Sequence, residues 1–199
     1  TEYAFYNCKS LKVVDLGSSV TKIGDYAFYQ CLGLERVVIN EGLEQIGDYA
    51  FYACEKLISS HEAQEIQKFV LPLSITTIGE YAFYNCASIE NISLEENSRL
   101  RYIGERAFAN LENTIFELAL IRSLIIGDYA FENCALLEEV KVQSIQEMGY
   151  GVFSGCQSLK YASLSSDKYA GEFFGDTYYE ESYSVNYQDT DYFIPLSLE

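Results

Sequence analysis

Apolar and polar positions repeat along the chain at a spacing much longer than that of a single helix or strand. The motif Ile23-Gly24-Asp25-Tyr26-Ala27-Phe28 recurs, and its phenylalanine marks each unit, at Phe5, Phe28, Phe51, Phe83, Phe108, Phe131 and Phe153. The steps between these positions are 23, 23, 32, 25, 23 and 22 residues. A nearly fixed period of this length is typical of an elongated array in which each unit stacks on its neighbours.

Within each unit, the apolar spacing predicts one short strand followed by a tight return. Leu34, Val37 and Ile39 are spaced 3 and then 2 residues apart. Because side chains alternate along a strand, we expect Val37 and Ile39 to point into the core. Arg36 and Val38 then lie on the outer face of the same strand. Strands of successive units are expected to pair in parallel at about 4.8 Å.

Two units depart from the regular pattern. The unit that leads to Phe83 is nine residues longer than the basic 23, and its excess is polar, at residues 59–65. An insertion of this size can leave the stack intact, since loop length costs little entropy. Residues 115–126 are almost continuously apolar, and there we take Leu118 and Leu120 as the inward pair.

A column of small or medium-sized residues stands three positions after each phenylalanine. Leu111 occupies this column in place of a cysteine, and leucine forms neither a disulfide nor a metal bond. Disulfides between neighbouring coils are the alternative, because adjacent Cα atoms can approach the required window of about 4.4–6.8 Å. We expect reduced cysteines that act as small hydrophobes. The predicted repeat core consists of Phe28, Cys31, Phe51, Cys54, Phe83, Cys86, Phe108, Leu111, Phe131, Cys134, Phe153 and Cys156.

The pattern I-G-x-x-A-F-x-x-C-x-x-L-x-x-[VI]-x-[ILV], taken from Ile23 to Ile39, resembles the BspA-like leucine-rich repeats of bacterial and some protozoan surface proteins. The resemblance covers residues 1 to about 165. It implies a right-handed leucine-rich repeat solenoid of about seven 23-residue repeats, with a parallel sheet on one face and short helical or 3-10 turns on the other. It also implies a cell-surface or secreted protein engaged in adhesion, and it carries no catalytic motif.

The period divides the chain into three parts. Residues 1–165 form the repeat array, which starts within a repeat and is therefore expected to be a piece of a longer array. Residues 166–193 are rich in Tyr, Asp, Glu and Ser, and we interpret them as an insertion between repeats. Residues 194–199 then begin the next repeat.

The charge of the chain excludes two kinds of partner. A net charge of −17 and a pI of about 4.3 argue against nucleic acid, whose binding depends on Lys and Arg contacts to phosphate. They also argue against an anionic membrane surface, and the apolar runs are too short for membrane insertion. Solubility is the ordinary role of such charge, and steering of a basic partner is the alternative.

Candidate catalytic and metal-binding residues do not form a recognisable motif. His61 is the only histidine, and Glu65 stands where a zinc protease motif needs a second one. Asp176 and the pair Asp189 and Asp191 have neither EF-hand spacing nor a glycine-rich repeat for calcium. We therefore predict no catalytic site, no metal site and no cofactor, and we do not expect an enzyme.

Two surfaces are candidates for binding. Tyrosines precede or follow the repeated phenylalanine in two columns, and we expect them mainly to stack on one another, with partner binding as the alternative. The outer face of the strands is less uniform, as a binding surface requires. The predicted ligand-binding residues on this strand face are Arg36, Val38, Lys68, Val70, Asn91, Ser93, Glu117, Glu139, Lys141 and Tyr161.

These observations favour a non-enzymatic binding or adhesion module. The resemblance implies a cell-surface or extracellular location and, as partner, a host matrix or cell-surface protein or a glycan. The alternative is a structural spacer that presents another domain of a larger surface protein. The two hypotheses differ in whether the strand face binds anything.

Overall fold

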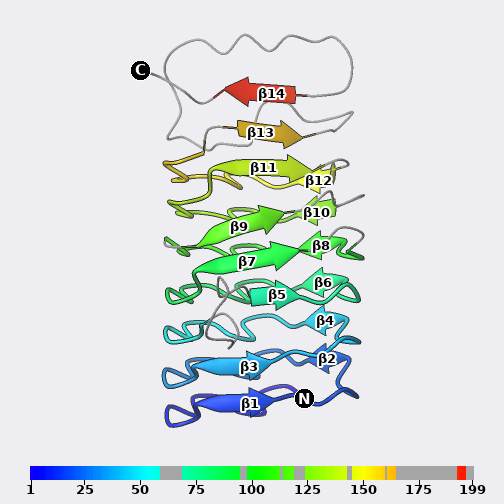
Figure 1. Cartoon of the computed structure of the whole chain (residues 1–199), viewed down its shortest axis with the longest axis vertical. Coiled ribbons are helices and arrows are strands. Elements are labelled where there is room, and N and C mark those ends of the chain that lie inside the picture. Colours follow the sequence, from blue (N-terminus) through cyan, green and yellow to red (C-terminus); the bar gives the residue numbers. More distant parts are fainter. Residues whose placement is uncertain are drawn as a thin grey trace, which may run out of the picture.

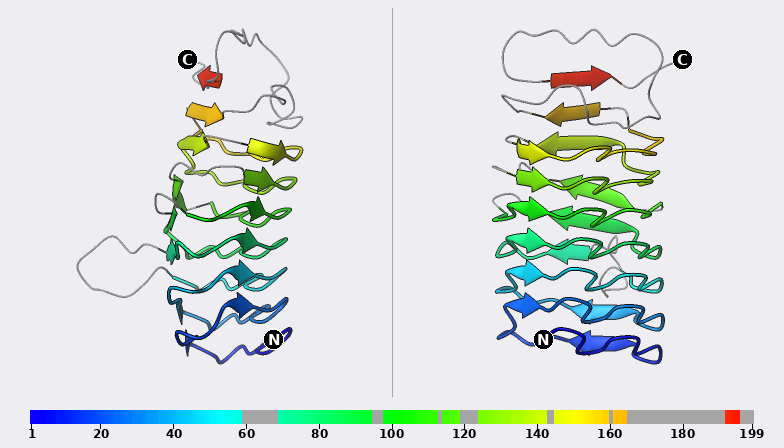
Figure 2. Two further views of the ribbon diagram at one scale, coloured as in Figure 1. Left: turned by 90° about the vertical axis from the view of Figure 1, so that its right-hand side faces the viewer. Right: turned by 180° about the vertical axis from the view of Figure 1, so that it is seen from behind.

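The computed structural model describes residues 1–58, 69–94, 98–112, 114–118, 124–142, 145–159, 161–164 and 192–195. Short strands stack on one another with their long axes across the stack, so that the molecule is a column of coils (Figure 1). The predicted solenoid of parallel strands is confirmed. Its two strand columns are separate in the side view (Figure 2).

The first strand column, here called the near side, contains the strands predicted from the sequence. Pairing on this side is parallel within three groups, β1–β3, β5–β7–β9 and β11–β13. The strands are β1 (Val13–Asp15), β3 (Arg36–Val38), β5 (Phe69–Leu71), β7 (Asn91–Leu94), β9 (Ile115–Leu118), β11 (Glu139–Val142) and β13 (Tyr161–Leu164).

A second strand column lies behind the first, where the sequence predicted only a return. Its six strands form one continuous parallel sheet in the order β12-β10-β8-β6-β4-β2. They are β2 (Lys22–Ile23), β4 (Gln45–Ile46), β6 (Thr77–Ile78), β8 (Tyr102–Ile103), β10 (Leu124–Ile126) and β12 (Ile145–Met148). Several of these strands have only two residues, which is too short for an alternating pattern to reveal them.

The coil is right-handed. As the chain climbs from β1, the near strands run to the right and the far strands run to the left (Figure 1). At the opposite end β14 (Tyr192–Pro195) pairs antiparallel with β13. A further repeat would instead pair in parallel. Residues 166–191 lie outside the described residues, so the division at 165 and 193 stays a prediction.

The tight turns that carry the Tyr-Ala-Phe motif are not helical, and the described residues contain no helix. The expected helical or 3-10 turn is therefore wrong, and the backbone shows why. Tyr26 and Gln30 have positive φ values of 57° and 53°, and equivalent residues recur in the other coils. Tyr26 N–H and Phe28 N–H donate to carbonyls of the next coil at 2.8 and 2.7 Å. Hydrogen bonds between coils replace those that a helix would make within itself.

The repeated phenylalanines form the centre of the core. Successive interior rings lie nearly parallel, with centroids 5.1–5.7 Å apart from Phe28 to Phe153. All twelve residues predicted for the repeat core are at most 2% exposed. Stacked aromatic rings of this kind contribute about 0.5–1.5 kcal/mol per pair beyond the area that they bury.

The irregular unit at 115–118 adopts a register two residues earlier than the sequence suggested. Phe116 pairs with the buried Ile92, and Leu118 pairs with Leu94, so Phe116 takes the first inward position of this strand. Phe116 is 7% exposed and meets both Phe108 and Phe131 edge-on, at 5.7 and 5.3 Å. The aromatic side chain thus takes the core position because it packs edge-on against two stacked rings at once.

The cysteine column is bonded to the preceding coil through its thiols. The Cys31 thiol donates to the Phe5 carbonyl at 3.0 Å, and the Cys54 thiol donates to the Phe28 carbonyl at 3.1 Å. Cys86, Cys134 and Cys156 repeat the contact at 3.0, 3.2 and 3.1 Å. All six cysteines are free. Burial raises the pKa of Cys86 to about 12, so the column is held in the unreactive thiol form.

The first prediction concerns the position of a phenylalanine in the stack. Phe83 and Phe108 are 0% exposed, whereas Phe5, at the end of the column, is 40% exposed. Phe83→Ala and Phe108→Ala should each lower the free energy of unfolding by about 3–5 kcal/mol. Phe5→Ala should cost distinctly less, because much of its ring already contacts water. Equal losses in urea unfolding would contradict a stack whose first coil is open.

The second prediction concerns the thiols. Cys8 is exposed and the other five cysteines are buried. A thiol reagent should therefore titrate one cysteine rapidly in the native protein and all six in denaturant. Cys8→Ser should abolish the rapid phase without changing the slow one. Fewer than six thiols in denaturant, under conditions that prevent oxidation during unfolding, would reveal disulfides and refute the bonding described for the column.

Candidate binding surfaces

The described residues offer no constellation for catalysis or for a metal ion. No group of three or more His, Cys, Asp or Glu side chains in this part of the chain is arranged to hold a metal. His61, Asp176, Asp189 and Asp191 lie outside the described residues. Likewise, none of the described segments is a helix long and apolar enough to cross a membrane.

The strand face of the near side exposes an uneven mixture of side chains. Val13, Val70 and Ile115 are 47%, 43% and 52% exposed, although all three are apolar. Arg36, Val38 and Ser93 are half-buried. In the register of the sheet, Val13 lies beside Arg36, and Val70 lies beside Ser93. The residue type varies from coil to coil along the described part of this face, whereas each turn column mostly repeats one residue type.

The structure places the remaining predicted residues of the strand face only in part. Glu117 pairs with Ser93 along the sheet, and Glu139 pairs with Tyr161. Lys141 also lies on β11. The described part of the structure does not include Lys68. It also leaves out the side chains of Glu117, Glu139, Lys141 and Tyr161.

Asn91 departs from the expected exposure. Its register partner Ile115 is 52% exposed, but Asn91 itself is only 3% exposed. A side chain with so little free surface offers nothing to a partner, and its inclusion among the outward binding residues is therefore wrong.

Arg36 stands out on the strand face because none of the ion pairs among the described residues involves it. Its Nε is buried and makes no hydrogen bond to any described residue. Of the ion pairs among the described residues, the nearest in sequence joins Lys12 to Glu35 at 3.6 Å. A buried donor without a described acceptor costs free energy, and with almost no free surface the Nε is not itself available to a partner.

The turn side of the solenoid carries the two tyrosine columns. Tyr3, Tyr26, Tyr49 and Tyr81 stack at 4.8–4.9 Å, with interplanar angles of at most 6°. Tyr6, Tyr29, Tyr52 and Tyr84 stack at 4.9–5.0 Å. Neighbouring rings of the two columns are tilted and lie 5.6–5.7 Å apart. The stacking expected from the sequence is present, and it leaves the ring edges at the surface.

Arg106 takes the place of a tyrosine in the first column, and the sequence analysis missed it. Its guanidinium carbon lies 4.4 Å from the centre of the Tyr129 ring and 5.9 Å from that of Tyr81. Its Nη1 donates to the Tyr81 hydroxyl at 3.1 Å and to Glu105 at 2.7 Å, and its Nε donates to Glu132 at 3.0 Å. The sequence did contain a sign of this site, because Arg106 is a basic residue at the motif position that tyrosine usually occupies.

A column of carboxylates accompanies the tyrosines. Asp48 accepts a hydrogen bond from the backbone N–H of Glu80 at 2.8 Å, and Asp128 accepts one from Tyr150 at 2.8 Å. Burial, followed by the negative charges of Asp48 and Glu105, raises the pKa of Glu80. Burial and neighbouring tyrosines and carboxylates raise the pKa of Tyr49 to about 12. The turn side is thus rich in acceptors and negative in potential.

The repeat pattern agrees with a known family. The model of the BspA type leucine-rich repeat region matches six copies in this chain, over residues 1–61 and 59–184. The chain therefore belongs to the BspA-type leucine-rich repeat family, whose solenoid is a protein-binding fold. The six copies compare with the roughly seven repeats expected from the phenylalanine positions. No curated protein matches the chain significantly.

Solved structures of bacterial leucine-rich repeat proteins are similar to this chain. A leucine-rich cell surface protein from Faecalibacterium prausnitzii A2-165 is 22% identical, with a TM-score of 0.51, over 80% of this chain and 56% of its own. The T. pallidum leucine-rich repeat protein is 29% identical, with a TM-score of 0.48, over 79% and 69% of the two chains. The chain spans little more than half of the F. prausnitzii protein, and that likeness shows the fold alone.

The third prediction follows from the carboxylate column. A carboxyl group whose pKa is higher in the folded state favours folding only while it is protonated, and this contribution is lost as the pH rises through the folded pKa. Glu80→Gln removes the unfavourable ionisation. The variant should therefore melt at a higher temperature than the wild type at pH 7, and the difference should disappear in acid, below the pKa of an unfolded glutamate.

Glu41→Gln provides the control, because Glu41 is exposed at the turn between the two strand columns. This substitution should leave the pH dependence of the melting temperature unchanged. If Glu80→Gln is no more stable than the wild type at neutral pH, the carboxylate column is not a site of electrostatic repulsion.

Proposed function

We propose that the chain is a non-enzymatic binding module of a cell-surface or secreted protein, and that it binds a protein partner through the strand face. Membership of a protein-binding repeat family supports the first part. The F. prausnitzii protein with the same fold is described as a cell surface protein, which supports the location. Adhesion to a host matrix or cell-surface protein is the form of binding that we favour.

We choose the strand face as the binding surface because it exposes a mixture of apolar and charged side chains on the near side. Val13, Val70 and Ile115 present apolar area to solvent, and the half-buried Arg36 adds a cation to the same face. Protein interfaces combine apolar contacts with arginine anchors. The turn columns, in contrast, repeat one residue type from coil to coil, as packing between coils requires.

Arg36 and two lysines supply the positive charges of this face. Lys68 and Arg36 each stand one residue before an inward side chain, Phe69 and Val37, so they occupy equivalent positions in the repeat. Lys141 lies on β11 one residue after Val140, in the position that Val38 holds on β3. In a chain of net charge −17, cations at these positions are suited to carboxylates or carbonyls of a partner.

The fourth prediction tests this surface by charge reversal. Matrix proteins and glycans would be screened for binding to the wild type and to the triple variant Arg36→Glu, Lys68→Glu, Lys141→Glu. A ligand of the strand face should lose at least about tenfold in affinity, since each unpaired or repelled charge in an interface costs on the order of 1 kcal/mol or more.

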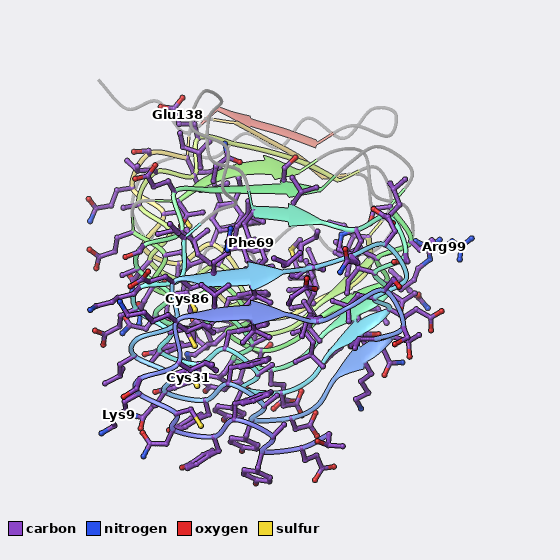
Figure 3. All side chains as sticks on the ribbon, turned by 60° about the horizontal axis from the view of Figure 1, so that its bottom comes forward. Lys9, Cys31, Phe69, Cys86, Arg99 and Glu138 are labelled. Carbon is purple, nitrogen blue, oxygen red and sulfur yellow. The ribbon has the colours of Figure 1, made fainter. Side chains whose placement is uncertain are left out.

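The matched control reverses Lys9, Lys22 and Lys56, which are exposed outside the near sheet, and so produces the same change in net charge. Lys9 projects outward at the turn edge of the solenoid, opposite to Arg99 (Figure 3). Equal loss of affinity in both triple variants would indicate a general charge effect and remove the strand-face assignment. Absence of any ligand would favour the spacer that presents another domain.

A further inference from the structure

The turn side contains a second surface, which we call the tyrosine–carboxylate stripe. It consists of Tyr26, Tyr29, Tyr49, Tyr52, Tyr81 and Tyr84 together with Asp48, Glu80 and Glu105. The ring faces are used in stacking at 4.8–5.0 Å, so no group can insert between the rings. The half-buried rings instead present their edges, the Tyr81 hydroxyl donates to Glu105 at 3.0 Å, and Tyr49 feels the charges of Glu80 and Glu105.

Arg106 shows which chemical group this environment accepts. At its level of the stack, a guanidinium replaces the ring and satisfies both kinds of acceptor, the Tyr81 hydroxyl at 3.1 Å and the Glu105 carboxylate at 2.7 Å. The guanidinium plane also lies over the face of Tyr129 at 4.4 Å. A planar cation with several donors is well suited to this combination of contacts.

The coils that precede Arg106 contain the same kinds of acceptor, but no described cation forms an ion pair with them. Among the described residues, the ion pairs with acidic groups of the turn side all involve Arg106, and none involves Asp25, Asp48 or Glu80. Asp48 and Glu105 both act on Glu80 as like charges. Apart from Glu105, which Arg106 pairs, the carboxylates of the stripe therefore keep negative charge that no ion pair among the described residues neutralises, within a chain of net charge −17.

We propose that the tyrosine–carboxylate stripe binds the arginine side chains of a basic, extended segment of a partner protein. Each guanidinium would donate to a tyrosine hydroxyl and to a carboxylate of the adjacent coil, as Arg106 does within the chain. Arginine is favoured over lysine because its donors form a planar fork that reaches two acceptors at once. This surface is separate from the strand face, so the two proposals stand independently.

The test compares nona-arginine with nona-lysine, which have equal charge, by titration calorimetry at low and at physiological salt. The wild type should bind nona-arginine at least about fivefold more tightly, the ratio that corresponds to about 1 kcal/mol of cation–π and bidentate contact. Binding should weaken as salt increases. Equal affinity for the two peptides, or no binding of nona-arginine, would overturn the proposal.

Two variants locate the binding. Glu80→Gln should weaken nona-arginine binding, and Glu41→Gln, an equal loss of charge on another edge, should have a smaller effect. Tyr49→Phe with Tyr52→Phe retains the ring stack, which melting temperature would verify, and removes two hydroxyl acceptors. This double variant should reduce the preference for arginine over lysine. Equal effects of the two glutamate substitutions, or an unchanged preference in the double variant, would show that the peptide binds through the acidic charge of the whole chain and not through the stripe.

The experiment also separates this proposal from the proposed function. Reversal of Arg36, Lys68 and Lys141 on the strand face should leave the arginine preference unchanged. If that triple variant loses the preference while Glu80→Gln keeps it, the peptide binds elsewhere and the stripe is not the site. Failure to find a ligand for the strand face has no bearing on this result.

Discussion

The structure depends on one geometric constraint, which is that each residue of a turn lies about 5 Å from its counterpart in the next coil. Aromatic rings meet this constraint well, because parallel rings make a favourable contact at 4.8–5.7 Å. Cysteine meets it through a thiol that donates to a carbonyl of the preceding coil. Glycine meets it by having no side chain: a Cβ on Gly104 would lie 2.5 Å from Glu80 N and 2.6 Å from Gly79 C.

Carboxylates meet the same constraint poorly, and the structure offsets the repulsion locally. Asp25 and Asp48 each accept a hydrogen bond from a backbone N–H of the following coil, at 3.2 and 2.8 Å. At Glu105, Arg106 supplies a cation directly. The acidic column is thus retained at an electrostatic cost, which is a physical reason to consider that it has a role in recognition as well as in packing.

The sequence alone predicted the parallel solenoid and its core, because both follow from a repeated apolar spacing. It failed where a feature depends on contacts between coils. The far strands are too short to produce a period, and the turn resembles a helix in spacing although its N–H groups donate to the next coil. Phe116, and not the expected Leu118, takes the first core position of its strand, because its ring packs against Phe108 and Phe131 from two different coils. Neither the burial of Asn91 nor the stacking of Arg106 could be obtained from a pattern within one unit.

The unequal continuity of the two strand columns gives the solenoid a direction of easier bending. The far sheet runs without interruption through six strands, whereas the near side consists, in the described residues, of three separate sheets. Bending that spreads the far strands must break a continuous ladder of hydrogen bonds. Bending in the opposite sense can open the junctions between β3 and β5 and between β9 and β11, where no ladder joins the described strands. We therefore expect the far side of the solenoid to be stiff and the near side to be more easily deformed. The curvature of the solenoid can then adjust to the shape of a partner bound to the near side.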